Sequence, residues 1–128
     1  MFTRNAINWF EIPTNDLERA LKFYETVFAM TLIPMDMPGF QMRMFPTDDR
    51  MGTSGALIYA PDFYKPSATG TMVYFNANPD LQVFLDRVET AGGTIVMPKT
   101  AIDPEIGFMA AIIDSEGNRV ALHSGPQA

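Results

Sequence analysis

The chain has 128 residues, of which 47% are hydrophobic and 19% charged, and its formal net charge is −6. This composition excludes a disordered chain and is typical of one globular domain with a sizeable core. Since no run of Lys or Arg is present that could follow a phosphate backbone, nucleic acid and anionic membranes are poor partners, and a small-molecule or protein partner is expected.

The sequence also contains no apolar signal core at its start, no segment apolar for long enough to span a bilayer, and no Cys. The absence of Cys excludes disulfides and thiolate catalysis and fits a reducing compartment. We therefore expect a cytoplasmic protein. Ten Met and fifteen aromatic residues are the less usual feature, because such side chains suit an adaptable apolar cavity as well as a core.

The first half of the chain reads as a strand, a helix and three further strands. Residues 7–12 form the first strand, and Asn15 with Glu18 fits an N-cap and its partner at the start of a helix. Apolar residues then recur at helical spacing, at Leu17, Ala20, Leu21, Tyr24 and Phe28. Strands are predicted at residues 31–36, 40–45 and 55–59.

The second half repeats this scheme. A strand at 71–76 precedes a second long helix, which opens at Asn78 and Pro79 and ends at the glycines of 91–93. Strands are predicted at 94–97, 108–113 and 119–123, the last two joined by the turn 114–118.

An internal repeat links the two halves. A shift of 64 positions places Asp16, Leu21 and Glu25 on Asp80, Leu85 and Glu89. The sequence thus predicts a single domain, residues 1–128, built of repeat units 5–60 and 70–125 and joined by a linker at 61–69.

Two segments carry a resemblance to a known family. FEIP at 10–13 leads to DLERA at 16–20 and FY at 23–24, and the chain closes on DSEGNRVALH at 114–123. With two successive βαβββ units, this pattern resembles the vicinal oxygen chelate superfamily, which includes glyoxalase I, bleomycin-resistance proteins and extradiol dioxygenases. The resemblance is nearest to bacterial glyoxalase-related proteins. It implies an α+β fold of two tandem βαβββ modules forming a concave, barrel-like sheet with flanking helices, and it implies a homodimer.

Members of this superfamily that bind a metal hold it on the first and last strands of each module. The corresponding positions here are Trp9, Met72 or Val73 depending on a one-residue slip, Ala121, and Leu57 by the 64-residue shift. Since none of these offers an imidazole or carboxylate, we expect no metal and no other cofactor.

Titratable groups remain on the same strands. If Trp9 and Ala121 point into the cavity, strand alternation brings Glu11 and His123 there too. One interpretation is an acid/base or hydrogen-bonding pair. The other is that Glu11 satisfies structural donors and His123 lies at the rim.

Three classes of function remain. The first is a metal-independent binder of a small apolar or aromatic molecule, whose wall is formed by Trp9, Leu57, Tyr59, Met72, Tyr74, Phe108 and Ala121. The second is a glyoxalase-like lyase or isomerase, either with an unrecognised divalent metal or with Glu11 and His123 as acid and base. The third is an interaction domain whose cavity is filled by its own side chains. We favour the first.

Overall fold

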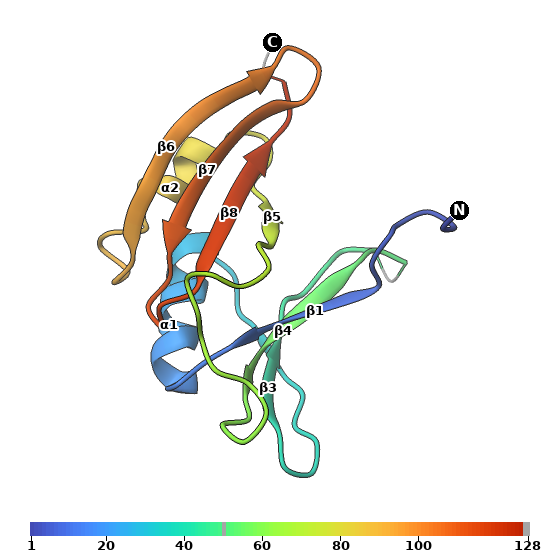
Figure 1. Cartoon of the computed structure of the whole chain (residues 1–128), viewed down its shortest axis with the longest axis vertical. Helices are drawn as coiled ribbons and strands as arrows, with labels where there is room; N and C mark the ends of the chain where they lie inside the picture. The colour runs from blue at the N-terminus through green and yellow to red at the C-terminus, as the bar shows by residue number, and fades with distance from the viewer. Residues whose placement is uncertain (50, 127–128) are drawn as a thin grey trace.

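Each half of the chain builds one four-stranded mixed sheet, and both sheets have the same strand order (Figure 1). The structure is a computed structural model that describes residues 1–49 and 51–126. The first sheet has the order β1-β4-β3-β2, with β1 at Trp9–Pro13, β2 at Ile33–Pro34, β3 at Gln41–Met44 and β4 at Ser54–Tyr59. The second has the order β5-β8-β7-β6, with β5 at Tyr74–Asn76, β6 at Thr94–Asp103, β7 at Gly107–Ile113 and β8 at Arg119–Ser124.

One helix follows the first strand of each module: α1 (Leu17–Phe28) follows β1, and α2 (Leu81–Leu85) follows β5. The first strand of each module pairs parallel with the last, and the other pairs are antiparallel. Two βαβββ modules confirm the predicted fold class. Within the described residues no strand pairing joins the two sheets, so they form an open, concave arrangement and not a closed barrel.

Helix α1 is central to the core because it packs against both modules. Its residues Phe23, Tyr24 and Val27 are fully buried in one cluster with Phe75 and Leu122 of the second module. Figure 1 shows α1 beside the ends of β7 and β8 as well as near β4. The relative position of the sheets is therefore set largely by this helix.

The start of α1 differs from the prediction by one residue. The N-cap is Asp16, whose carboxylate accepts a hydrogen bond from the backbone N–H of Arg19 at 3.1 Å. Asn15 lies one residue outside the helix, where its backbone N–H donates to the Glu116 carboxylate of the second module. Asn and Asp are about equally favoured as N-caps, so local preference does not separate the two positions.

Helix α2 is much shorter than predicted. Asp80 caps it, only Leu81–Leu85 is α-helical, and the N–H groups of Arg87 and Val88 bond three residues back in tighter turns. The segment carries Asp86 and Glu89 near its end, where the helix dipole favours cations, and it closes in two glycines with low helix propensity. No helix in the described part of the chain is long and apolar enough to cross a membrane.

Strand β6 is longer than the predicted 94–97, since it continues through Pro98 to Asp103 with irregular pairing to β7. Pro98 is tolerated because β6 is the edge of its sheet, where a missing N–H breaks no ladder on the open side. Strands β2 and β5 are shorter than predicted, at two and three residues.

The turn between β7 and β8 connects the second module to the start of α1. One oxygen of Glu116 accepts the backbone N–H groups of Asn15 and Asp16 at 2.9 and 2.8 Å, and the other accepts Arg19 Nε at 2.7 Å. Burial acts to raise the pKa of Glu116, but the hydrogen bonds from Arg19 and Asp16 outweigh it, so this pKa lies below its usual value.

Two further bonds complete this junction. The buried Tyr24 hydroxyl donates to Asp114 Oδ2 at 2.7 Å, and Asn118 Nδ2 donates to the carbonyl of Pro13 at 2.8 Å. Burial, together with the nearby Asp114 carboxylate, raises the pKa of Tyr24 well above its usual value. The turn 114–118 therefore holds the two modules together through buried hydrogen bonds.

Candidate functional site

A crevice of about 1040 Å³ lies between the two modules, at the open edges of β1 and β5. Both modules contribute to it, through the segment 4–10, the end of α1 and the segments 45–48, 53–54 and 71–76. This volume is at the upper end of the roughly 300–1,000 Å³ typical of small-molecule sites. The crevice is thus large enough for a drug-sized molecule.

The inner wall of the crevice is aromatic. Phe75 lies at its centre, with ring centroids 5.6 Å from Phe10, 4.9 Å from Phe28 and 5.3 Å from Phe45. These tilted and edge-to-face contacts fix each ring against its neighbours. Trp9, Met30, Met72 and Val73 extend the apolar lining. The result is a preformed apolar surface suited to a flat guest.

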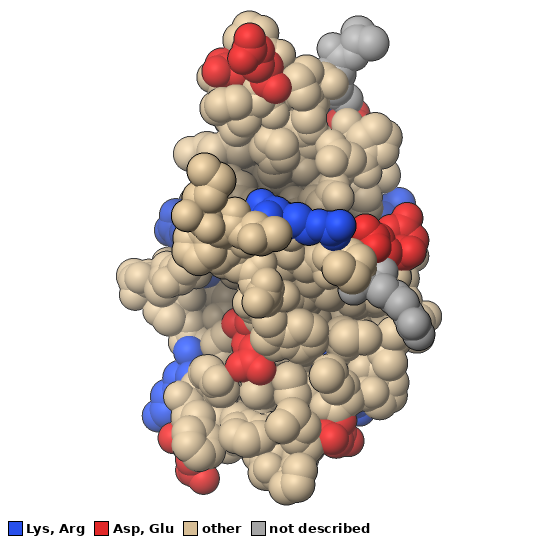
Figure 2. Space-filling model, turned by 90° about the vertical axis from the view of Figure 1, so that its right-hand side faces the viewer, with Lys and Arg blue, Asp and Glu red and all other residues tan. Residues whose placement is uncertain are grey.

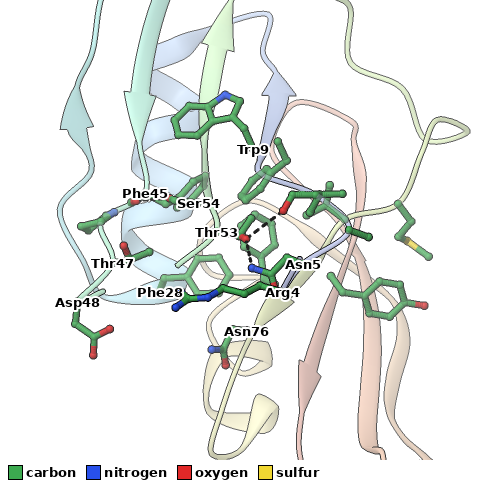
Figure 3. A pocket seen from close by; sticks show the side chains of 18 of the residues that line it. Arg4, Asn5, Trp9, Phe28, Phe45, Thr47, Asp48, Thr53, Ser54 and Asn76 are labelled. Carbon is green, nitrogen blue, oxygen red and sulfur yellow. Dashed lines mark hydrogen bonds between the residues drawn. The ribbon is translucent and has the colours of Figure 1, made fainter. Parts of the chain in front are cut away.

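The rim of the crevice is polar and is drawn in Figure 3. Asn5 Nδ2 donates to Thr53 Oγ1 at 2.8 Å, and the Thr53 hydroxyl donates to the carbonyl of Ile7 at 3.3 Å, which ties the N-terminal segment to the first module. Arg4 and Asp48 are the charged residues among the described lining residues. The N-terminal segment is therefore part of the site.

Of the seven residues predicted to form the wall, the structure places Trp9, Met72 and Tyr74 in this crevice. The other four lie outside its lining. Leu57 is fully buried in the core, and Tyr59 packs against the same core from the outside. Phe108 also packs there, beneath the ammonium group of Lys99, and Ala121 is buried in β8 opposite Tyr74.

Glu11 and His123 have separate partners. Glu11 Oε2 accepts the Trp9 indole N–H at 3.3 Å, and a hydrogen bond with Glu11 raises the pKa of Tyr64 from its usual value. His123 Nε2 lies 2.9 Å from the carbonyl of Ile106. In the described part of the chain no hydrogen bond or ion pair joins Glu11 to His123, and their acid/base role stays a prediction.

Corresponding hydrogen bonds define how the modules superimpose. The N–H of Thr14 donates to the carbonyl of Ile58 at 2.8 Å, and the N–H of Ala77 donates to the carbonyl of His123 at 2.7 Å. Thr14 is therefore equivalent to Ala77, a shift of 63 residues, and Ile58 is equivalent to His123, a shift of 65 residues. The helix caps Asp16 and Asp80 differ by 64 residues.

This register gives the positions at which the resemblance implies metal ligands. They fall on Trp9 in β1, on Met72 two residues before β5, and on Ala56 and Ala121 in β4 and β8. The position derived from the simple 64-residue shift, Leu57, points into the core instead. One indole, one thioether and two methyl groups supply no imidazole or carboxylate, so these residues do not fit the metal of the superfamily.

A second arrangement of metal ligands is also absent from the described residues. Among the residues that the structure describes, no three His, Asp or Glu side chains converge as a cation site would require. Figure 2 shows the side of the molecule nearest the N-terminus in Figure 1, and uncharged residues cover most of it. Chemistry at this face depends on apolar contact and isolated polar groups.

The aromatic inner wall and Arg4 were not predicted from the sequence. Phe10, Phe28, Phe45 and Phe75 follow the core-facing alternation of their elements, so the pattern indicated core and not site. No local signal separates a core ring that borders a crevice from one that does not. Arg4 lies before the first strand, where sequence periodicity carries no information.

Comparisons with known proteins agree with this architecture. Residues 7–45 match the family model described as bleomycin resistance protein-like N-terminal. None of the curated proteins matches the chain. The family match covers the first βαββ elements, where the FEIP and DLERA segments lie.

Solved structures share the fold over nearly the whole chain. A glyoxalase/bleomycin resistance protein from Albidiferax ferrireducens T118 is 18% identical with a TM-score of 0.68, and the match covers 95% of this chain and all of that chain (100%). A glyoxalase-related enzyme from Fulvimarina pelagi is 15% identical with a TM-score of 0.67, over 93% of this chain and 87% of that chain.

A V278E mutant of glyoxalase I from Zea mays is 24% identical with a TM-score of 0.66, covering 91% of this chain and 44% of that chain. This chain thus spans less than half the length of the maize protein. At these identities the likeness establishes the fold, which is that of the glyoxalase/bleomycin-resistance proteins. The predicted resemblance to the vicinal oxygen chelate superfamily is confirmed at the level of the fold.

Proposed function

We propose that this protein binds a small apolar or aromatic molecule in the crevice between its modules, without a metal. The observation that carries the proposal is the aromatic wall. Phe10, Phe28 and Phe45 of the first module and Phe75 of the second line the inner wall of a crevice of about 1040 Å³ and are held by mutual ring contacts. Such preformed apolar concavities with few polar groups are the usual form of a small-molecule site.

Metal independence is supported by the identity of the side chains at the superfamily's ligand positions. Catalysis by a bound cation requires His or carboxylate ligands that leave open coordination sites. The positions that the resemblance implies for these ligands correspond to Trp9, Met72, Ala56 and Ala121, none of which carries an imidazole or a carboxylate.

We further propose that the protein acts in the cytoplasm as a homodimer. Large apolar side chains, among them Ile7, Trp9 and Tyr74, are exposed along the edges of the crevice. A second copy related by symmetry would cover them. Light scattering at micromolar concentration should give twice the chain mass of 14.3 kDa, and a monomer mass would reject the dimer.

The binding proposal is tested through Trp9, which is the single tryptophan and lines the crevice. We expect 2-naphthol and menadione, two flat neutral compounds, to quench or shift its emission in a saturable way, because the indole would stack on the guest. Calorimetry should show weaker binding to Trp9→Leu and unchanged binding to Phe63→Leu, an exposed aromatic outside the crevice.

Two outcomes would reject the proposal. If neither emission nor heat responds to these compounds, the crevice does not accept flat apolar guests, and an interaction domain becomes the better account. If binding is equal in wild type, Trp9→Leu and Phe63→Leu, the guest binds elsewhere.

A further inference from the structure

The crevice has a positively charged group at its mouth. Arg4 lines the crevice, and its side chain crosses the Phe28 ring in the view of Figure 3. Among the described residues Arg4 forms no ion pair and no hydrogen bond through its side chain. A guanidinium carries five N–H donors and keeps its charge at any physiological pH, so it is available to a ligand.

The position of Arg4 is fixed by its neighbours. Its φ of +69° is in the left-handed region, and the N–H of Asn5 bonds back to the carbonyl of Thr3 at 3.1 Å, which closes a three-residue turn around Arg4. The Asn5 side chain then anchors the turn to Thr53 of the first module. The bend presents the Arg4 side chain to the crevice although the residue lies near the chain terminus.

Other donors lie on the opposite side of the mouth, along β5. Asn76 Oδ1 accepts the N–H of Asn78 at 3.1 Å, which orients the Asn76 amide and leaves its NH₂ group as the donor. The carbonyl of Val73 and the N–H of Ala77 bond to β8. By strand alternation Tyr74 and Asn76 direct their backbone N–H groups away from β8, to the open edge beside the crevice.

One carboxylate competes with this arrangement. Asp48 is the acidic residue among the described lining residues, and it lies on the segment that follows β3, at the edge of the group drawn in Figure 3. Its charge repels an anion at the mouth. The opposed signs of Arg4 and Asp48 give the two residues opposite expected effects on an anionic guest.

From these positions we infer that the ligand has a flat apolar body and one anionic group, and that Arg4 binds the anionic group while the body lies on the phenylalanine wall. The inference rests on the proposed binding function of this crevice. An Arg–carboxylate pair is charge-assisted and can be bidentate, and it is strengthened beside apolar surface, where water screens it less. An apolar body without the anion would leave the Arg4 donors to water.

The test compares two probes with the same body, 2-naphthoate and 2-naphthamide, by Trp9 emission and calorimetry at low ionic strength. Wild type should bind 2-naphthoate about tenfold more tightly than 2-naphthamide, a factor expected for one well-placed charged hydrogen-bonded pair. Arg4→Gln should remove this preference and leave the affinity for 2-naphthamide unchanged. Asp48→Asn should increase the preference.

Arg119→Gln is the matched control, because Arg119 is exposed and lies outside the crevice lining. It should bind both probes as wild type does. Thermal unfolding of Arg4→Gln should match wild type, since the Arg4 side chain has no partner among the described residues.

The outcomes separate the two proposals. Equal affinity of wild type for both probes would overturn the anionic ligand class and leave the binding function standing. A loss of affinity for both probes in Arg4→Gln would also overturn it, because the residue would then be structural. Failure of wild type to bind either probe would overturn the binding function itself.

Discussion

Replacing Glu116 by Gln should destabilise the protein by about 2–3 kcal/mol, since a buried carboxylate with charge-assisted hydrogen bonds becomes a neutral amide. The side chain of Glu116 is 0% exposed and its two oxygens accept from Asn15, Asp16, Arg19 and Ser115. Gln keeps one acceptor oxygen, so whichever way the amide turns, its NH₂ group faces a donor.

The expected loss is smaller than the roughly 3–5 kcal/mol typical of a fully buried ion pair that loses one partner. The Arg19 side chain is 53% exposed, so water can solvate its charge once Glu116 is neutral. The backbone N–H groups of Asn15 and Asp16 keep a neutral acceptor if the Gln oxygen takes the place of Oε1. The variant loses the hydrogen bond from Arg19 Nε, and its remaining hydrogen bonds go to a neutral amide oxygen in place of a charged carboxylate.

The assay is urea unfolding followed by circular dichroism at pH 7 and at equal protein concentration, with Glu18→Gln as the matched control. Glu18 is exposed and its nearest cation, Arg43, lies 3.9 Å away, so the control should cost less than about 0.5 kcal/mol. The thermal midpoint of Glu116→Gln should fall by about 6–12 °C. If Glu116→Gln costs no more than Glu18→Gln, the turn between β7 and β8 does not hold α1 in place.

Three other outcomes are expected. The folded-state pKa of Glu116 is lowered, so the stability that its carboxylate contributes is present above the unfolded pKa of about 4.3 and is lost as the pH falls through the folded value. Urea midpoints measured from pH 5 downward should therefore show the difference in stability between wild type and Glu116→Gln becoming smaller. Gly93→Ala should lower the free energy of unfolding by about 1–3 kcal/mol, since a Cβ there would lie 2.6 Å from Phe23 Cε1 and 2.8 Å from the carbonyl oxygen of Ile113. The control Gly70→Ala places its Cβ in open space and should leave the unfolding midpoint nearly unchanged. Equal midpoints for the two variants would refute the clash. Protein purified without chelator should contain no stoichiometric transition metal by elemental analysis, and added zinc, nickel, manganese or iron(II) should not shift its thermal midpoint, because a ligand of the native state alone must raise it.

Features that depend on local periodicity were predictable from the sequence. The two βαβββ units, the buried face of α1 and the 64-residue offset of Asp16 from Asp80 follow from spacing, although the caps themselves were predicted at Asn15 and Asn78. Trp9 in β1, Tyr74 in β5 and Met72 just before β5 line the crevice, and their part in binding a ligand stays a prediction. Strand alternation and helical repeat are properties of a short stretch of chain.

Features that form only where the two modules pack together depend on the tertiary structure. In the folded chain Phe10, Phe28, Phe45 and Phe75 contact one another as one aromatic wall, and Arg4 lies at the mouth of the crevice. The sequence pattern of these rings is that of core residues. Whether a core face borders a crevice depends on the angle between the sheets, and contacts between residues about a hundred positions apart set that angle.

The same reason explains the errors of detail. Leu57 was assigned to the cavity by a uniform shift of 64 residues. The equivalent hydrogen bonds from Thr14 to Ile58 and from Ala77 to His123 show that the shift is 63 residues for the first strands and 65 for the last strands. A change of one residue turns a strand side chain to the other face of its sheet. Local pattern therefore determined which elements form, and the pairing of distant segments determined which of their side chains face the crevice.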